Sequence, residues 1–558
     1  MRQAEKNNTL WIVLLLCVML GSLVVFIIIL SCVPPVSKDA LVHHLAVPKL
    51  YLKHGGMYEI PFMPFSYYPM NLDLLYLIPL YFGNDIIPKF IHFCFALFTA
   101  WLIFEYLKRR ISALYGLIGA LFFLSIPIIV KLSITVYVDL GLISFSTASL
   151  LLLFRWMENG FHMRTLIFSA VLCGLAMGTK YNGLVSFFLL TFFVPFLHSR
   201  YNQVKKPGFF RSAGQGLIFF FIALMIFSPW MIRNYNWKNN PIYPLYNNWF
   251  NPPKNQVIKA ITRDGIKKQN HGLFTYRNII YKEKWWQLML LPVRIFFQGK
   301  DGNPQYFDGK LNPFLLFLPF LAFFRVREGP AFIRNEKMIL LVFSVLFLGF
   351  AFFSSGLRIR YVSPIVPPLV ILSVFGIWNI IQIVQRFSTP LAKKTGLAVA
   401  FLIIGFSLAL NAHYVVTQFK YVKTFDYLNG TLSRDEYIER YVPEYPVTRY
   451  INKNLAKKAK ILFIFLGKRG YYCDRDYVLG NDTLYQIVKN SDSPEQILSE
   501  LKNKGITHFL IRYDIFDKWK KDNFSHNKLY LLDIFMAKYS KMLFIKRAFG
   551  LSRLENID

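Results

Sequence analysis

Apolar runs separated by polar segments recur along the chain from residue 10 to residue 412. Several are shorter than the roughly 20 residues that an upright helix needs to cross a bilayer, so their ends are approximate. Eleven such runs predict a mainly α fold, a polytopic bundle of membrane-spanning helices. The predicted spans are 10–31, 85–107, 111–130, 134–155, 165–181, 183–198, 214–232, 312–325, 338–354, 362–384 and 396–412.

The stretch 165–198 decides the number of spans, because it is either one long tilted helix or two short helices. A lysine in the middle of a membrane is costly, and Asn-Gly is a turn dipeptide. We therefore expect two helices broken at 179–183, with Lys180 at the outer face.

Positive charge predicts the orientation. Five basic clusters lie in the loops between spans. With eleven spans, all five fall on the cytoplasmic side, which satisfies the positive-inside rule. The N-terminus is then inside and the C-terminus outside, as in a multi-pass protein of a bacterial-type inner membrane. The clusters are 108–110, Arg155 with Arg164, 200–211, Arg325 with Arg327 and Arg334, and Arg386 with Lys393 and Lys394.

The cytoplasmic clusters do not account for the whole net charge of +33, because the outer loop 233–311 is also basic. Such a face favours anionic lipid headgroups or phosphorylated substrates, and a general lysine bias is the alternative.

Three segments lie outside the predicted membrane. The first outer loop, 32–84, is expected to hold short helices at 39–53 and 70–82, and 233–311 forms a long loop. Residues 413–558 are long enough for a small domain of their own, beside a membrane module of residues 1–412. Expected strands at 460–467 and 507–514 give this domain an α/β character. Between them, Ser493 is placed to cap a helix that ends near Gly505.

Asp39 follows the exit of the first span by a few residues and is the first candidate catalytic group. A carboxylate at a membrane surface can act as a general base, although an acid at a helix start also simply complements the helix dipole. His43 and His44 could bind phosphate or a metal, but histidines more often pack and hydrogen-bond. Asp39 and His43 alone do not define a metal site.

Two charged residues fall at the outer ends of later spans. Asp139 opens the fourth span, where it could orient a catalytic group or form a structural ion pair. Lys180 lies at a break among small residues, where it could hold a lipid phosphate or extend toward the interface as an ordinary snorkelling lysine.

Arginines supply the remaining candidates. Arg358 and Arg360 precede Tyr361 at the start of a span, and Arg233 ends the seventh span. Arginine forks match phosphate oxygens, although arginines at span ends are common. The sequence contains no Walker, GxGxxG-Rossmann, HExxH or GxSxG motif, so an energy source must come with the substrate.

These motifs, in this order along one topology, resemble the GT-C glycosyltransferase superfamily, within it the RgtA/B/C/D-like enzymes related to ArnT and the protein O-mannosyltransferases. Two departures stand out: Ala40 follows Asp39 where many relatives carry an Asp-Glu pair, and 68–71 replaces a His-Pro-Pro segment. The matching segments are Asp39, 67–71, 138–140, 174–180, 229–234, 240–244 and 360–367.

The resemblance implies an inverting transferase that takes a sugar from a polyprenyl-phosphate carrier at the outer face. By this resemblance Asp39 is the catalytic carboxylate of the first loop, and Lys180 and Arg360 hold the donor phosphate. A divalent cation is the one cofactor left open, with no metal ligands assigned. The expected partners are the lipid donor, a glycolipid, polysaccharide or protein acceptor and the bilayer, with no nucleic acid.

Two other classes compete. A transporter or flippase of this size would show two related halves and broken helices near the membrane midplane, and no such halves are visible in the sequence. A non-enzymatic assembly or polymer-export subunit, with the C-terminal domain for docking, is the third reading.

Overall fold

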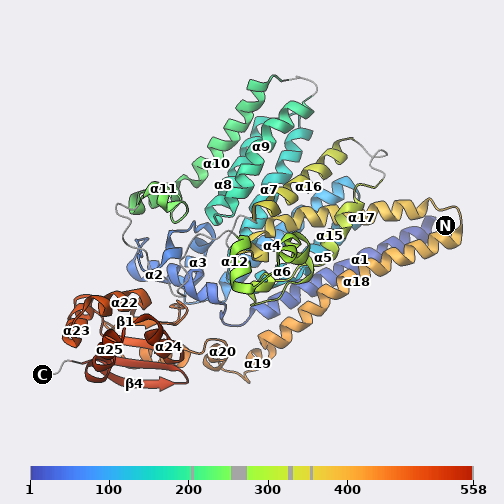
Figure 1. Ribbon diagram of the computed structural model, residues 1–558. Helices are drawn as coiled ribbons and strands as arrows, with labels where there is room; N and C mark the ends of the chain where they lie inside the picture. Colours follow the sequence, from blue (N-terminus) through green and yellow to red (C-terminus); the bar gives the residue numbers. More distant parts are fainter. Residues whose placement is uncertain (1, 203–206, 253–272, 325–330, 352–355, 556–558) are drawn as a thin grey trace. The chain divides into compact units, whose positions relative to one another are not determined.

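The computed structural model describes residues 2–202, 207–252, 273–324, 331–351 and 356–555 (Figure 1). The chain divides into two compact units. The first, which we call the helical unit, comprises Met1–Cys32, Tyr67–Leu75 and Ile87–Thr424. The second, the sheet unit, comprises Val33–Ser66, Tyr76–Ile86 and Phe425–Asp558.

Long helices dominate the helical unit, and α1 lies beside α18 (Figure 1). Phe26 and Phe419 connect these two helices through an edge-to-face ring contact with centroids 5.9 Å apart. The helices of this unit are α1 (Arg2–Ser31), α4 (Ile87–Arg110), α5 (Ala113–Ser125), α6 (Pro127–Ser133), α7 (Asp139–Glu158), α8 (Met163–Thr179), α9 (Gly183–Tyr201), α10 (Phe209–Lys238), α11 (Asn247–Phe250), α12 (Leu273–Tyr281), α13 (Trp285–Met289), α14 (Leu291–Phe297), α15 (Phe314–Leu321), α16 (Ala331–Ala351), α17 (Val366–Gln385) and α18 (Pro390–Val422), with 3-10 turns η3 (Pro304–Tyr306), η5 (Ile359–Tyr361) and η6 (Ser363–Ile365).

The polytopic helical architecture is confirmed. Within the described residues, seven helices are long and apolar enough to cross a membrane, or up to eight if α5 and α6, bent by 67°, form one span. The other predicted spans correspond to α8 with 17 residues, to the 8-residue α15 and to α16, whose first turns carry charged residues. Parts of the loop 233–311, of the spans ending at 325 and 354, and of the basic clusters at 200–211 and 325–334 lie outside the described residues.

The predicted break near Lys180 is also confirmed. Helix α8 ends at Thr179 and α9 begins at Gly183. A Cβ atom at Gly183 would lie 2.5 Å from the backbone of Ala176, so the close return of the chain at this point requires glycine. Two short helices therefore meet at a tight, polar turn.

The sheet unit has the expected α/β character, with a five-stranded sheet of order β2-β1-β3-β5-β4. β1 pairs in parallel with β2 and β3, whereas β5 pairs antiparallel with β3 and β4. β1 and β3 coincide with the two predicted strands. The strands are β1 (Lys460–Ile464), β2 (Asp476–Leu479), β3 (His508–Arg512), β4 (Ser540–Lys546) and β5 (Phe549–Leu554).

The sheet unit also contains helices, some of them from the first loop. The two predicted loop helices are present, the first as a π-helical turn followed by α2. Helix α3 passes from one unit into the other, and α18 reaches Val422, so the predicted boundary at 413 falls within a helix. The remaining elements are η1 (Ala40–His44), α2 (Ala46–His54), η2 (Pro64–Tyr67), α3 (Asn71–Tyr81), α19 (Thr424–Leu428), α20 (Arg434–Tyr441), α21 (Tyr445–Asn454), α22 (Asn481–Asn490), α23 (Pro494–Asn503), α24 (Tyr513–Asn523) and α25 (His526–Tyr539).

The start of α23 follows the predicted capping pattern. The Ser493 hydroxyl accepts a hydrogen bond from the Gln496 backbone N–H at 3.3 Å. The Gln496 side chain accepts from the backbone of Asp492 rather than of Ser493, at 2.6 Å. Gly505 has φ +70° just after the helix, which suits glycine at this stop.

Alternate residues of β1 and β3 build the core of the sheet unit, because successive side chains of a strand point to opposite faces. One face contributes Leu462, Ile464, Phe509 and Ile511, all buried. They pack against fully buried side chains of the helices: Leu484 and Val488 of α22, Ile497 and Leu501 of α23, and Leu532 and Phe535 of α25.

The alternation of basic clusters predicts the membrane orientation, which thiol labelling can test. In a variant without the native cysteines, a membrane-impermeant thiol reagent added to intact cells should label Met57→Cys, Lys300→Cys and Lys453→Cys. Lys108→Cys should react only after the cells are permeabilised, because its cluster is expected inside. Labelling of Met57→Cys and Lys453→Cys from opposite sides would contradict this topology.

Candidate functional site

Lys180 and Asp139 form an ion pair in the helical unit. The Lys180 Nζ lies 2.6 Å from the Asp139 Oδ1, and the Asp139 side chain is completely buried. Asp139 is the first residue of α7, and Lys180 directly follows the end of α8. The contact therefore joins the ends of two neighbouring helices through opposite charges. Both residues were predicted from the sequence, and the structure places them together.

His92 fixes the start of α7, a role that the sequence analysis missed. The backbone N–H of Leu140 donates to the Nε2 atom of His92 at 2.9 Å. The Nδ1 atom of His92 is then protonated and donates to the carbonyl of Leu132 at 3.0 Å. A buried histidine in an apolar helix was the only available signal, and it does not identify these partners.

Arg360 and Tyr361 join this cluster from η5. The Arg360 guanidinium carbon lies 5.0 Å from the ring centroid of Tyr137 and 5.3 Å from that of Tyr361. The Lys180 Nζ lies 5.2 Å from the same Tyr361 ring. One tyrosine thus contacts both cations, in the geometry of cation–π interactions. Four of the predicted site residues, which come from three distant parts of the chain, form one cluster.

A side chain in the break between α8 and α9 binds the backbone of η5. The side-chain amide of Asn182 donates to the carbonyl of Tyr361 at 3.2 Å. The Ser363 hydroxyl donates to the carbonyl of Arg360 at 2.8 Å. These bonds fix the backbone near Lys180 and Arg360. The two cations are therefore held closer to a fixed separation than they would be on flexible loops.

Arg358 faces a carboxylate of the preceding loop. Its Nη1 lies 3.3 Å from Asp308, whose other carboxylate oxygen lies 3.0 Å from the Nζ of Lys131. The N–H of Ile359 donates to the carbonyl of Phe307 at 2.8 Å, which fixes the same loop. In this structure Arg358 therefore helps to attach the 300–311 segment, and a phosphate contact stays a prediction.

Arg233 contacts the backbone of the 67–71 segment of the first loop. Its Nη2 donates to the carbonyls of Tyr67 and Tyr68 at 2.7 and 3.1 Å. Its guanidinium carbon lies 4.6 Å and 5.0 Å from the ring centroids of Trp230 and Trp237. These contacts position the 67–71 segment, and a direct contact with phosphate stays a prediction for this residue too.

Asn71 belongs to the same arrangement. It ends the matching segment 67–71, and the sequence alone assigned it no role. Its side chain accepts from the Trp230 indole at 2.8 Å and donates to the carbonyl of Leu175 at 3.4 Å. A Cβ atom at Gly178 would collide with the Asn71 amide. The small residues of 174–180 therefore let Asn71 approach α8 closely.

Asp39, His43 and His44 lie in the sheet unit and thus in a different unit from Lys180 and Arg360. Asp39 is half-buried and directly precedes the π-helical turn, in which the Leu45 N–H donates to the carbonyl five residues earlier at 2.9 Å. His43 stacks on Phe65 with ring centroids 4.7 Å apart. The catalytic assignment of Asp39 stays a prediction, as do binding roles for the two histidines.

The described residues do not fit a metal ion held by the protein. Within the described ranges, no three His, Cys, Asp or Glu side chains lie close enough together to coordinate one. We therefore derive no step of the reaction through a metal ion.

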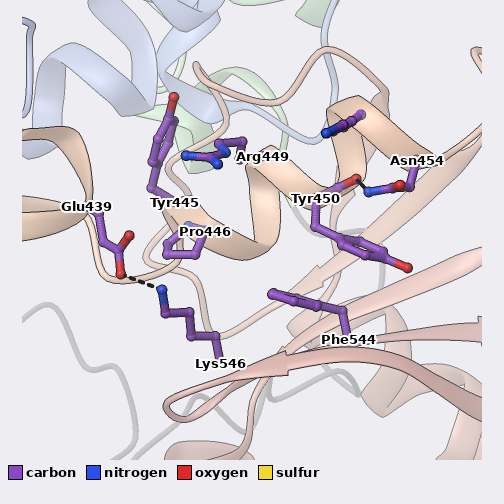
Figure 2. A pocket seen from close by; sticks show the side chains of 9 residues that line it. Glu439, Tyr445, Pro446, Arg449, Tyr450, Asn454, Phe544 and Lys546 are labelled. Carbon is purple, nitrogen blue, oxygen red and sulfur yellow. Dashed lines mark hydrogen bonds and ion pairs between the residues drawn. The ribbon is translucent and has the colours of Figure 1, made fainter. Parts of the chain in front are cut away.

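The sheet unit also contains a cavity of about 320 Å³ that sequence analysis did not identify (Figure 2). Two of its cations have carboxylate partners: Lys546 lies 2.9 Å from Glu439, and Arg449 lies 2.9 Å from Asp435. No predicted site residue lines this cavity. Its lining residues are Glu439, Tyr445, Pro446, Arg449, Tyr450, Lys453, Asn454, Phe544 and Lys546.

Sequence comparison gives one partial match. The profile of the family described as dolichyl-phosphate-mannose-protein mannosyltransferase matches residues 80–232. This segment contains Asp139 and Lys180 but neither Asp39 nor Arg360. No protein with a curated description matches the sequence.

Comparison with solved structures gives matches over nearly the whole chain. ArnT from Cupriavidus metallidurans bound to undecaprenyl phosphate matches with a TM-score of 0.56 at 15% identity, over 98% of this chain and 98% of that chain. Its apo state matches with a TM-score of 0.54 at 14% identity and the same coverage. The oligosaccharyltransferase AglB from Archaeoglobus fulgidus, in complex with an inhibitory peptide and a dolichol-phosphate, gives 0.48 at 12% identity, over 96% of this chain and 74% of that chain. The protein therefore has the fold of the GT-C membrane glycosyltransferases, the superfamily that its sequence motifs resemble.

Proposed function

We propose that this protein transfers a sugar from a polyprenyl-phosphate carrier to an acceptor outside the cytoplasm, with inversion at the sugar carbon. The observation that carries the proposal is the meeting of Lys180 and Arg360 at one tyrosine ring in a GT-C fold. The ArnT structure named above holds undecaprenyl phosphate, which supports a carrier of this class.

The proposed donor is an anionic lipid, so its phosphate needs cations at the depth where lipid and headgroup meet. Lys180 supplies a compact point charge, and Arg360 supplies a planar fork that can bind two phosphate oxygens. Arg360 is only 7% exposed, and a phosphate beside it would be partly desolvated. Electrostatic attraction is stronger in such a place than at an open surface.

Asp139 would act as a positioning residue for the donor site. Its carboxylate holds the Lys180 ammonium at 2.6 Å and so restricts the rotamers of a long side chain. An ordered cation loses less conformational entropy when it binds phosphate than a mobile one does. Tyr361 would have the same effect on Arg360.

The proposed reaction is a single displacement. The acceptor oxygen or nitrogen attacks the sugar C1, the bond from C1 to the phosphate oxygen breaks, and the lipid phosphate leaves with the electron pair. Asp39 takes the proton from the acceptor, and Lys180 and Arg360 stabilise the negative charge that develops on the leaving phosphate. Attack opposite the leaving group inverts the configuration.

The proposed location is the inner membrane of a bacterial-type cell, with the N-terminus in the cytoplasm and the site at the outer face. The basic clusters predicted to be cytoplasmic support this orientation. Glycolipid, polysaccharide and protein remain the three acceptor classes, and mass analysis of cell-envelope glycans in a deletion strain would separate them.

Asp39→Asn tests the proposed base. The substitution keeps the size of the side chain and removes its basicity, so turnover should fall by the roughly 10²–10⁴-fold that is typical when a general base is lost. Binding of the lipid donor should change little. Steady-state turnover and donor affinity of the purified protein in nanodiscs measure both quantities.

The matched control is Asp514→Asn, which removes an exposed carboxylate of the sheet unit that is paired with Arg512 at 2.8 Å. This variant should turn over like the wild type. Normal turnover in folded Asp39→Asn would reject the base assignment.

Lys180→Ala and Arg360→Lys test the proposed phosphate site. Loss of Lys180 should weaken undecaprenyl-phosphate binding by about 1.5–3 kcal/mol, the range for hydrogen bonds to charged groups. Arg360→Lys should also weaken it although it keeps the charge, because lysine cannot form a fork. Affinity is measured on folded protein in nanodiscs.

Lys337→Ala provides a control for the loss of a buried lysine elsewhere in the helical unit, since the Lys337 ammonium donates to the Ala322 carbonyl at 2.7 Å. If Lys180→Ala and Arg360→Lys both bind the lipid like the wild type, the phosphate site is elsewhere, and Arg233 and Arg358 become the next candidates.

A further inference from the structure

The end of the connection between β1 and β2, together with the first residue of β2, forms a turn, residues 469–476, that contacts the first loop within the sheet unit. Tyr472 donates its hydroxyl to the carbonyl of Pro35 at 2.7 Å. The backbone N–H groups of Gly470 and Tyr471 both donate to the carbonyl of Leu41, each at 3.2 Å. Pro35 and Leu41 lie four residues before and two residues after Asp39. The turn therefore holds the backbone on both sides of the proposed base.

Two lysines of α2 extend this attachment. The Lys49 ammonium donates to the carbonyls of Tyr471 and Cys473 at 2.8 and 3.3 Å, and to the Asp474 carboxylate at 2.7 Å. Lys53 donates to the Asp476 carboxylate at 2.6 Å. Lys49 thus uses all three of its donors on one turn, which is more than a surface ion pair would require.

The turn is itself fixed from its other side. The Asn452 amide donates to the carbonyl of Tyr472 at 2.8 Å, and its oxygen accepts from the N–H of Asp474 at 2.9 Å. Arg475 donates to the carbonyl of Leu455 at 2.8 Å. Helix α21 and the segment after it therefore hold 469–476 in one conformation, so the turn can transmit the rigidity of the sheet unit to the loop.

The contacts are protected from water. Leu41 and Cys473 are buried, with exposures of 1% and 4%, and Pro35 is also buried. Burial in this place raises the pKa of the Tyr472 hydroxyl well above its usual value, so Tyr472 remains a hydrogen-bond donor at any physiological pH. A buried hydrogen bond without its donor leaves an unsatisfied carbonyl, which is costly.

We propose that the turn 469–476 is a positioning element that fixes Asp39 for catalysis. The inference rests on the proposed function, since it assumes that Asp39 is the base. A general base must lie within hydrogen-bonding distance of the proton it removes, and displacements of about 1 Å can reduce rate by about 10²-fold. The π-helical turn after Asp39 is a rare conformation. External hydrogen bonds at Leu41 would hold it in place.

This proposal gives the C-terminal domain a role in turnover that is separate from substrate binding. In the contacts described, Tyr472 binds the backbone of the first loop and Lys49 binds the backbone of the turn, and neither binds the Asp39 carboxylate, so they are positioning residues. Their loss should change the rate of the chemical step and leave the affinity for the lipid donor unchanged.

Tyr472→Phe and Lys49→Gln test the proposal in the full-length protein in nanodiscs. Each should lower kcat by about 10- to 100-fold, the range expected for a misplaced catalytic group. Undecaprenyl-phosphate affinity should stay at the wild-type value. Lys49→Arg, which keeps charged donors, should recover part of the rate. Amide hydrogen exchange of a peptide covering 35–45 should become faster in both variants.

Two variants serve as matched controls in the same domain. Tyr539→Phe removes a hydroxyl that donates to Glu495 at 2.6 Å, and Lys520→Gln removes an ammonium 2.7 Å from Asp533. Neither residue contacts the first loop in the bonds described. Both variants should keep the wild-type kcat and the wild-type exchange of 35–45.

The outcomes separate this proposal from the proposed function. Unchanged kcat and exchange in Tyr472→Phe and Lys49→Gln would overturn the positioning role. Faster exchange with normal kcat, while Asp39→Asn is inactive, would also overturn it, because the turn would then hold the loop without setting the base. Slow turnover and faster exchange in both variants, together with an inactive Asp39→Asn, would support it. A fully active Asp39→Asn variant would reject the base and with it the positioning role.

Discussion

The pairing of Lys180 with Asp139 is the constraint on which the polar cluster of the helical unit depends. Asp139 is completely buried, and an unpaired charge among apolar helices would be strongly destabilising. The helix break at 180–182 is tolerated because α7 begins beside it with a carboxylate, while Tyr361 contacts the ammonium from the other side. The ends of α7 and α8 and the 358–363 segment must therefore meet at one point.

The sheet unit meets a similar requirement with neutral hydrogen bonds. Its first-loop segment has carbonyl groups at Pro35 and Leu41 that need donors once they are buried, and the turn 469–476 supplies three of them. Two charged donors, Lys49 and Lys53, attach α2 to the same turn. Both units thus fix irregular backbone by hydrogen bonds to carbonyl groups, and both pair their buried carboxylates with cations.

Sequence reasoning predicted the features that local chemistry determines. The Asn-Gly turn and the cost of a lysine in a membrane sufficed to predict the break near Lys180, and the capping pattern sufficed to predict the start of α23. The segments 460–467 and 507–514 were recognisable as strands. Contacts between residues far apart in the sequence could not be predicted in this way. The pairing of Arg358 with Asp308, and the role of His92 at the start of α7, depend on segments that come together only in the folded chain.

The arginines show why residue type alone does not assign a binding role. A guanidinium fork suits two phosphate oxygens, but it suits a carboxylate or a pair of carbonyls equally well. Arg233 contacts the carbonyls of Tyr67 and Tyr68, and Arg358 contacts a carboxylate, so both contribute to the structure as it stands. Arg358 and Arg360 both lie over the Tyr361 ring that Lys180 also contacts, but Arg360 is closer, at 5.3 Å against 5.9 Å, and is buried. A buried guanidinium beside a lysine ammonium can bind one phosphate group, which is why the donor site is proposed there.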